Sequence, residues 1–184
     1  MSAAAESGIV VRPAIAPDIK RILELDTTTT TDYIWQMDLR EEDAQTRVTF
    51  QRTRLPRSIK IVPPYDINLL AMDWKQRALV VVGDVAGRLV GYLTLTYVTT
   101  PQVGVIADFA VDRLARRQGV GTLLLNTARD WAASAGLNRL IIETQSKNFP
   151  AILFCQRNGF AYCGYNDRYY STQDIALFFG MKLR

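Results

Sequence analysis

The stretch from Val105 to Thr144 constrains the fold of this chain more than any other. It begins inside an apolar, β-branched run of strand length, Val103–Val111, and ends with a second such run, Arg139–Thr144. Between the two runs, apolar residues such as Leu124 and Ala128 recur at the spacing of one face of an amphipathic helix. Strand, turn, helix and strand in this order predict a parallel βαβ unit with a right-handed crossover.

The segments on either side of this unit predict strands and short helices. Two apolar runs separated by a short turn, and two alternating runs further upstream, are typical of hairpins. The predicted fold is therefore α+β, of the α/β type, with a mixed and mostly antiparallel central sheet, one parallel βαβ unit and flanking helices. The segments are strand Ile9–Pro13, helix Ala16–Leu25, strands Tyr33–Asp38 and Arg47–Arg52, strands Leu79–Gly83 and Leu89–Tyr97, and a turn at Thr100–Gln102.

Three upstream segments have more than one interpretation. The threonine-rich run Asp26–Asp32 predicts a flexible loop or the start of a strand, with a binding motif as the alternative. Leu39–Ala44 predicts the link of an extended hairpin, and its carboxylates either face a cationic substrate or are solvated. Tyr65–Arg77 fits a short helix or a loop, and the sequence does not decide between them.

Length and charge restrict the class of protein. The 184 residues predict one domain, 1–184, in which 1–8 is a flexible leader. That leader lacks the basic and apolar regions of a signal peptide, and no apolar run is long enough to cross a membrane. A polyanionic cofactor is sufficient reason for the net charge of +4, so nucleic acid is not required as a partner.

The absence of histidine narrows the chemistry. Without imidazole the chain has no Ser-His or Cys-His nucleophile pair and no imidazole-ligated metal site. Its two cysteines, Cys155 and Cys163, lack the spacing of a metal knuckle, so we expect no metal. With no export signal they are expected to be reduced thiols, which predicts a cytoplasmic protein.

The turn Arg116–Thr122 lies where the helix of the βαβ unit begins. The first N–H groups of a helix have no partner within the helix and carry partial positive charge. Two glycines leave room for a ligand, and three arginines add positive charge. The turn therefore predicts a phosphate or pyrophosphate site, with an ordinary strand-to-helix loop and solvated arginines as the alternative. The residues are Gly119 and Gly121, with Arg113, Arg116 and Arg117.

A second block follows the last strand of the βαβ unit. Asn148 suits the N-cap of a short helix, Pro150 its first turn, and Asn158–Gly159 its end. Together with the turn, this block resembles the acyl-CoA signature of the GNAT N-acyltransferases, and the resemblance extends to streptothricin acetyltransferases. The signature residues are Arg116, Gly119, Gly121, Asn148, Ala151, Phe154 and Gly159–Phe160; the streptothricin-like ones are Glu143–Gln145, Asn148, Gly164, Asp167 and the ending Ala176–Leu183.

The resemblance implies acetyl-CoA as the donor and a primary amine as the acceptor. In such proteins the backbone of the central strand pairs with the pantetheine arm as an added strand, and the amides of the turn hold the pyrophosphate. An asparagine at the second helix hydrogen-bonds the pantetheine arm. In this sequence the strand residues are Phe109, Ala110 and Val111, the turn residues are Arg116, Arg117, Gln118, Gly119, Val120, Gly121 and Thr122, and the asparagine is Asn148.

Amine acetylation needs a base, because an ammonium group has no lone pair with which to attack a thioester. Asp108 and Glu143 are each the lone carboxylate in an apolar run, so burial is expected to make either a better base. The alternative for both is a paired structural carboxylate. Many relatives carry a second acidic residue before the aspartate, where this chain has Ala107. An oxyanion donor is expected among the backbone N–H groups near Val111.

The identity of the acid has several interpretations. The tyrosine that follows Phe154 in the family is Cys155 here. A thiol can donate a proton but reaches less far than a phenol, and the alternative for Cys155 is a small buried helix residue. In that case either the thiolate of CoA leaves without an acid or a nearby phenol donates the proton. The candidate phenols are Tyr162, Tyr165, Tyr169 and Tyr170.

The leading hypothesis is an acetyl-CoA-dependent N-acetyltransferase acting on a primary amine, such as the lysine-like amine of streptothricin, with antibiotic resistance as the outcome. A CoA-binding regulatory or interaction module with little turnover, motivated by Cys155, is one alternative, and a protein or peptide N-acetyltransferase is another. A nucleic-acid-binding domain fits less well, because the arginines cluster at the turn. The oligomeric state is left open, a homodimer included.

Overall fold

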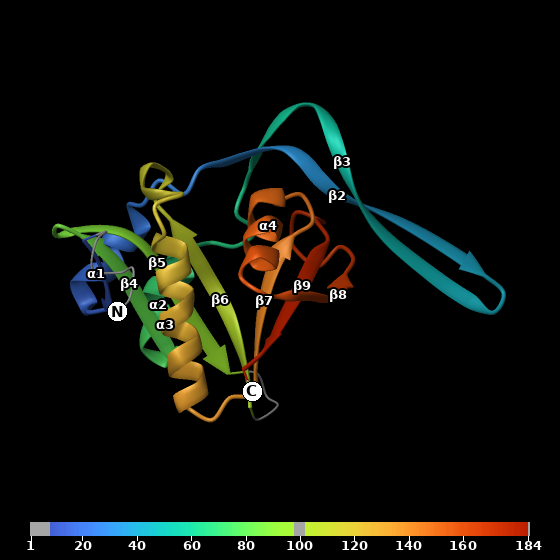
Figure 1. The fold of residues 1–184 in the computed structure, drawn as a ribbon. Helices are drawn as coiled ribbons and strands as arrows, with labels where there is room; N and C mark the ends of the chain where they lie inside the picture. Colours follow the sequence, from blue (N-terminus) through green and yellow to red (C-terminus); the bar gives the residue numbers. More distant parts are fainter. Residues whose placement is uncertain (1–7, 98–101, 184) are drawn as a thin grey trace.

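The computed structural model describes residues 8–97 and 102–183 (Figure 1). Residues 1–7 of the expected leader, and Thr100 and Pro101 of the expected turn, lie outside this part. In chain order the elements are β1 (Ile9–Pro13), α1 (Ala16–Leu23), β2 (Thr29–Glu42), β3 (Gln45–Ile61), α2 (Asn68–Asp73), the 3₁₀ helix η2 (Trp74–Gln76), β4 (Leu79–Val85), β5 (Arg88–Tyr97), β6 (Val103–Val111), the 3₁₀ helix η3 (Arg113–Ala115), α3 (Val120–Ser134), β7 (Arg139–Gln145), α4 (Phe149–Arg157), β8 (Ala161–Asn166) and β9 (Ala176–Lys182).

Seven of the strands form one sheet in the order β1-β4-β5-β6-β7-β9-β8, and β2 and β3 form a separate two-stranded ribbon. Every neighbouring pair in the sheet is antiparallel except β6 and β7, which are parallel and are connected through α3. This confirms the predicted mixed, mostly antiparallel sheet with one parallel βαβ unit and flanking helices.

Helices cover both faces of the sheet because successive strand residues point to opposite sides. In β4, Val81 packs in the cluster that holds the apolar stripe of α3, whereas Val82 packs in the cluster of α1 and α2. Leu124 and Ala128 of α3 are completely buried there, as their spacing predicts. Figure 1 shows α3 lying along one face of the sheet. Among the described residues, no helix combines the length and apolar character needed to cross a membrane.

The ribbon of β2 and β3, which we call the arm, differs most from the sequence prediction. Its strands contain 14 and 17 residues, and they are joined by only Asp43 and Ala44. The expected link Leu39–Ala44 is therefore wrong for its first four residues, because the alternation of the strands continues to Glu42. β2 begins within the threonine run, at Thr29, so that run is the start of a strand.

Two smaller differences concern helices. The segment Tyr65–Arg77, which the sequence left undecided, forms α2 and η2. α1 ends at Leu23, two residues before the expected end. Its first turn is as expected, with Pro17 near the N-terminus and a buried Asp18 whose carboxylate accepts hydrogen bonds from the Ile15 N–H and from Arg12.

Candidate active site

β6 and β7 run side by side for only part of their length. Their parallel register pairs Val103–Ile106 with Arg139–Ile142 and stops there. Ala107 is an extra residue in the register between β5 and β6, and a bulge of this kind bends the strand that carries it. Beyond it the two strands part, and in the described part of the chain the edge of Ala107–Val111 that faces β7 has no strand partner. We call this opening the wedge.

A cavity of about 1160 Å³ lies in the wedge. Its walls are the parted ends of β6 and β7, the first turn of α3, one side of α4, and the segment that follows β3. The cavity therefore brings together most of the residues that the sequence analysis selected. Those that line it are Asp108, Phe109, Ala110, Val111, Arg116, Arg117, Gly119, Gly121, Thr122, Glu143, Asn148 and Cys155.

Two of the predicted cofactor residues do not line the cavity. The Gln118 side chain donates a hydrogen bond to the Leu114 carbonyl (3.0 Å), which fixes it against the preceding turn. Val120 is buried and packs in the main core cluster. The side chains of these two residues therefore stabilise the turn, and only their backbone groups remain as candidates for binding a ligand.

The N-terminus of α3 is open to a ligand. Its N-cap is Gly119, with φ +90°, and no side chain caps the free amides that follow. A Cβ at Gly119 would have no atom within 4 Å, so the space beside it is empty of protein. Arg117, at φ +66°, adds a second left-handed residue in the same turn. Successive N–H groups in such a turn form a concave site suited to an anion.

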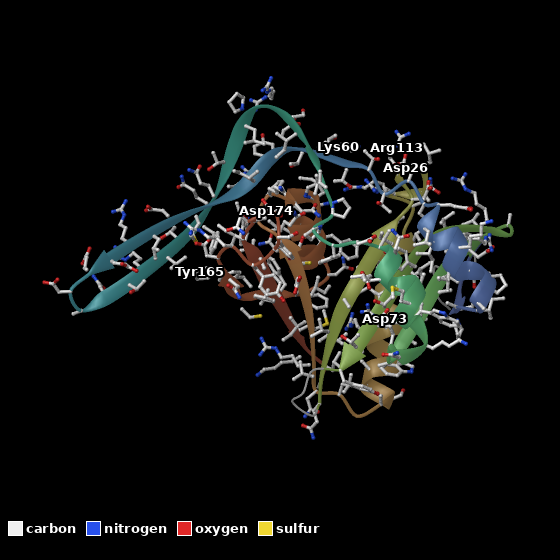
Figure 2. All side chains as sticks on the ribbon, turned by 180° about the vertical axis from the view of Figure 1, so that it is seen from behind. Asp26, Lys60, Asp73, Arg113, Tyr165 and Asp174 are labelled. Carbon is white, nitrogen blue, oxygen red and sulfur yellow. The ribbon has the colours of Figure 1, made fainter. Side chains whose placement is uncertain are left out.

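The arginines of the turn have different roles. Arg116 is half-buried, and its guanidinium donates to the carbonyls of Val111 (3.0 Å) and Thr28 (2.8 Å) and to Thr29 Oγ1 (2.9 Å). Arg113 pairs with Asp26 at 2.8 Å, and Figure 2 shows these two residues together. Both side chains thus tie the turn to the segment before β2 and to the first residue of that strand. Arg117 is exposed and forms no ion pair with any described residue, so it is the arginine left to meet a phosphate.

Gly121 and Asn148 shape the wall formed by α3 and α4. A Cβ on Gly121 would lie 3.2 Å from Phe154 Cε2, and the Phe154 ring makes an edge contact with Phe109 at 5.3 Å. Glycine at position 121 therefore lets the two aromatic rings pack closely. This is a second reason for glycine here, in addition to the room it leaves for a ligand. Asn148 caps α4 as predicted, since its Oδ1 accepts from the Ala151 N–H at 3.3 Å.

Glu143 is the candidate base whose surroundings fit that role. Burial raises the pKa of its carboxyl group, the neighbouring hydroxyls of Tyr170 and Tyr169 lower that pKa in part, and the charge of Asp108 raises it further. The net direction is upward. A half-buried carboxylate with a raised pKa at the wall of a cavity can take a proton from an amine at neutral pH.

Asp108 is paired, as the structural interpretation of this carboxylate expects. Its Oδ2 accepts from Thr94 Oγ1 at 2.9 Å and lies 3.5 Å from Arg77 Nη1. Arg77 in turn is held by Asp73, at 2.9 Å. These partners hold the Asp108 charge in place near Glu143.

Three tyrosines stand around Glu143. The rings of Tyr65 and Tyr170 are 6.1 Å apart, and those of Tyr169 and Tyr170 are 5.1 Å apart. Burial and the nearby charge of Glu143 raise the pKa of both Tyr65 and Tyr170, so these phenols stay protonated. The Tyr170 hydroxyl is buried and makes no hydrogen bond of normal geometry to the described residues, although it lies beside Glu143.

Sequence reasoning missed Tyr65 and Arg77, because both lie in the segment whose structure it left undecided. Tyr169 and Tyr170 are two of the four phenols that the sequence offered as the acid. Tyr162 and Tyr165 instead pack with the arm, against Phe50, at 5.7 and 5.5 Å.

Cys155 lies at the cavity wall but belongs to the core. It is 1% exposed and packs in the main core cluster. Burial raises the pKa of its thiol to about 12, which makes it a poor proton donor near neutral pH. These observations favour the interpretation of Cys155 as a small buried helix residue.

The carboxylates of the expected hairpin link are not part of the cavity. Asp38, Glu41, Glu42 and Asp43 are exposed near the tip of the arm, which projects away from the sheet, and none of them lines the cavity (Figure 1). Within one copy of the chain they are therefore solvated, and the expectation that they face a substrate is not supported.

This chain is similar to known acetyltransferases over nearly its whole length. Streptothricin acetyltransferase from Streptomyces lavendulae is 28% identical over 179 residues, which cover 92% of this chain and 93% of that protein. The crystal structure of nourseothricin acetyltransferase has a TM-score of 0.82 at 23% identity, covering 96% of this chain and 99% of that one. A protein from Bacillus anthracis str. Ames described as a candidate streptothricin acetyltransferase, solved with acetyl coenzyme A, has a TM-score of 0.75 at 18% identity, covering 95% of this chain and 99% of its own. The Acetyltransferase (GNAT) family model matches residues 37–160, more than half of the chain, which therefore belongs to the GNAT acetyltransferase family.

Proposed function

We propose that this acetyltransferase uses acetyl-CoA to acetylate a primary amine on a cationic small molecule of the streptothricin type. The observation that carries the proposal is the wedge, in which a free strand edge, an uncapped helix N-terminus and a half-buried carboxylate line one cavity. The similarity to streptothricin acetyltransferase over nearly its whole length supports the choice of acceptor.

The wedge has the groups that acetyl-CoA requires. The unpaired backbone of Phe109–Val111 suits an extended chain of amides such as the pantetheine arm, which would add to β6 as a strand. The free amides at Gly119–Thr122 and the unpaired Arg117 suit the pyrophosphate. Bound there, acetyl-CoA supplies an acetyl group activated as a thioester.

Glu143 is the residue we assign as base. Its carboxylate takes a proton from the ammonium group of the acceptor, which frees the lone pair that attacks the acetyl group. Tyr65, which also lines the cavity, supplies an aromatic ring that can attract a cation before the proton is lost. A backbone N–H near Val111 is the donor we propose for the developing oxyanion.

Asp108 acts through Glu143. It is held in place by Arg77 and Thr94, and from there it raises the pKa of Glu143. We therefore treat Asp108 as a positioning residue and Glu143 as the proton acceptor.

The two cysteines are free thiols, in keeping with a cytoplasmic enzyme.

The proposal is tested by an acceptor panel. The protein is incubated with acetyl-CoA and, separately, with streptothricin, free lysine and peptides with a free N-terminus, while release of the CoA thiol and the product mass are followed. We expect the highest kcat/KM with streptothricin. A peptide acetylated with higher kcat/KM would favour the peptide N-acetyltransferase alternative. Acetyl-CoA binding with no product on any acceptor would favour the regulatory module.

A matched pair of variants tests the donor site. Gly119→Asp adds a carboxylate at the open helix N-terminus, where it opposes an anionic ligand. Gly87→Asp is the control, because Gly87 also has a left-handed φ, +83°, and also has no atom within 4 Å of a built Cβ. We expect Gly119→Asp to weaken acetyl-CoA binding about a hundredfold in calorimetry, and Gly87→Asp to leave it unchanged. Equal affinity in the two variants would refute the phosphate site.

A further inference from the structure

The arm has an apolar face that the rest of the chain only partly covers. The register pairs Trp35 with Arg52, Met37 with Phe50, and Leu39 with Val48, so these side chains share one face of the ribbon. At the inner end of this face, Trp35 packs on Phe179, with ring centroids 5.9 Å apart. This packing anchors the arm to the sheet.

The outer part of the same face has no cover from the body. The arm extends well past β8, and Figure 2 labels Tyr165 beneath its inner end. Leu39 is 46% exposed, although Leu39 and Val48 form a cross-strand pair on the apolar face. An exposed apolar strip on a projecting ribbon is unusual for a surface that stays in water.

The charges on the arm are unevenly distributed along its length. Near the tip, the carboxylates outnumber the cations Arg40 and Arg47, which form a cross-strand pair. Three carboxylates cluster at the tip, and four cations lie on the inner half of β3. All seven side chains are exposed, and none forms an ion pair with a described residue. They are Glu41, Glu42 and Asp43 at the tip, and Arg52, Arg54, Arg57 and Lys60 on the inner half.

From this pattern we propose that the arm is a self-association surface through which two copies of the chain form a dimer. With the two arms antiparallel about a two-fold axis near Leu39 and Val48, the apolar strips face one another. The same symmetry brings the acidic tip of each arm near Arg52 and Arg54 of the other, so each contact between opposite charges occurs twice. Such a surface is self-complementary, as a two-fold interface must be.

The charge pattern selects a second copy over other partners. A nucleic acid or an anionic surface would be attracted by Arg52 and Arg54 but repelled by Glu41 and Glu42 on the same arm. A second arm satisfies both groups and covers the apolar strip between them. In the dimer, the tip carboxylates of one copy lie near the arginines on the inner half of the other copy's arm. In a single copy these two groups lie apart on the same arm.

The first test is the oligomeric state of the full chain, measured by light scattering and analytical ultracentrifugation over a range of concentrations. We expect twice the mass of the 20.7 kDa chain. Leu39→Lys should raise the dimer dissociation constant about a hundredfold or more, because both copies lose a buried leucine. Met72→Lys is the control, since Met72 is exposed on α2, away from the arm.

A charge-exchange experiment tests the antiparallel arrangement. The double variant Glu41→Lys/Glu42→Lys and the double variant Arg52→Glu/Arg54→Glu should each be monomeric alone, because like charges then meet at both ends of the interface. Mixed together they should form a heterodimer, in which both contacts again join opposite charges. A monomeric wild-type chain at about 100 μM, where even a weak interface would be populated, would overturn the proposal. The proposal would also be overturned if the wild-type chain is a dimer and Leu39→Lys and the two double variants all remain dimers.

Discussion

Replacing Glu143 by glutamine tests the assignment of the base with very little change in shape. Glutamine keeps the size and hydrogen-bonding capacity of the side chain but cannot accept a proton. The two other carboxylates among the lining residues are engaged, Asp108 with Arg77 and Thr94, and Asp66 with the backbone and side-chain amides of Asn68. We therefore expect kcat to fall by about 10³, within the range for loss of a general base, which corresponds to about 4 kcal/mol in the activation barrier.

The pH profile gives a second measure of the same variant. Burial raises the pKa of Glu143, so in the wild-type enzyme activity should fall as the pH drops through that raised value and the base becomes protonated. Glu143→Gln has no such group, so the acidic limb of its kcat profile should disappear. The profile is measured at saturating acceptor and acetyl-CoA, so that the titration of the free amine does not obscure it.

Stability should change in the opposite direction from activity. Because the folded-state pKa of Glu143 is raised, the protonated form stabilises the fold at low pH, and this contribution is lost as the pH rises through the folded-state value. The uncharged glutamine avoids the cost of a half-buried charge. Glu143→Gln should therefore have a higher Tm than the wild type at pH 7, and the difference should shrink at low pH.

Asp108→Asn is the matched control for this experiment. It should lower the Tm, because it removes one of the two carboxylate partners of Arg77. It should also shift the acidic limb to lower pH without removing it, since the nearby negative charge is lost. The assay is thiol release at a series of pH values, together with thermal unfolding of each variant. A Glu143→Gln enzyme with wild-type kcat and an intact acidic limb would refute the assignment.

Other substitutions probe the walls of the cavity. Tyr170→Phe removes a hydroxyl that lies beside Glu143 and lowers the pKa of its carboxyl group, so the acidic limb should move to higher pH. Cys155→Ala should cost about 1 kcal/mol through a small core cavity and leave kcat within about twofold. Gly121→Val should push the Phe154 ring into the wedge and raise the acetyl-CoA dissociation constant about tenfold by calorimetry.

The βαβ unit could be predicted from the sequence because local rules and tertiary packing agree there. β6 has the predicted bounds, Val103–Val111, and α3 buries the apolar stripe read from its spacing. The glycine turn could likewise be predicted, since Gly119 adopts the left-handed conformation that favours glycine.

The rest depends on contacts between distant segments. Nothing local reveals that Arg116 would be bound by Thr28 and Thr29, or that Tyr65 would meet Tyr170. The length of the arm was underestimated because charged residues near its tip are typical of a loop, whereas here they lie on an exposed strand end. The alternation of Leu39 and Val48 was the signal that could have extended it.

The parting of β6 and β7 has a consequence for how this enzyme tolerates sequence change. The sheet has two halves, one built from β1, β4, β5 and β6 and the other from β7, β8 and β9. They are joined by four residue pairs between β6 and β7, all at one end of these strands. A donor that pairs with the free edge of β6 would brace the two halves, adding about 2.7 kcal/mol of stability when its concentration is a hundred times its dissociation constant. Destabilising substitutions in either half would then be masked in a cell rich in the donor and exposed in a starved one, so the metabolic state of the cell would help to decide which variants survive.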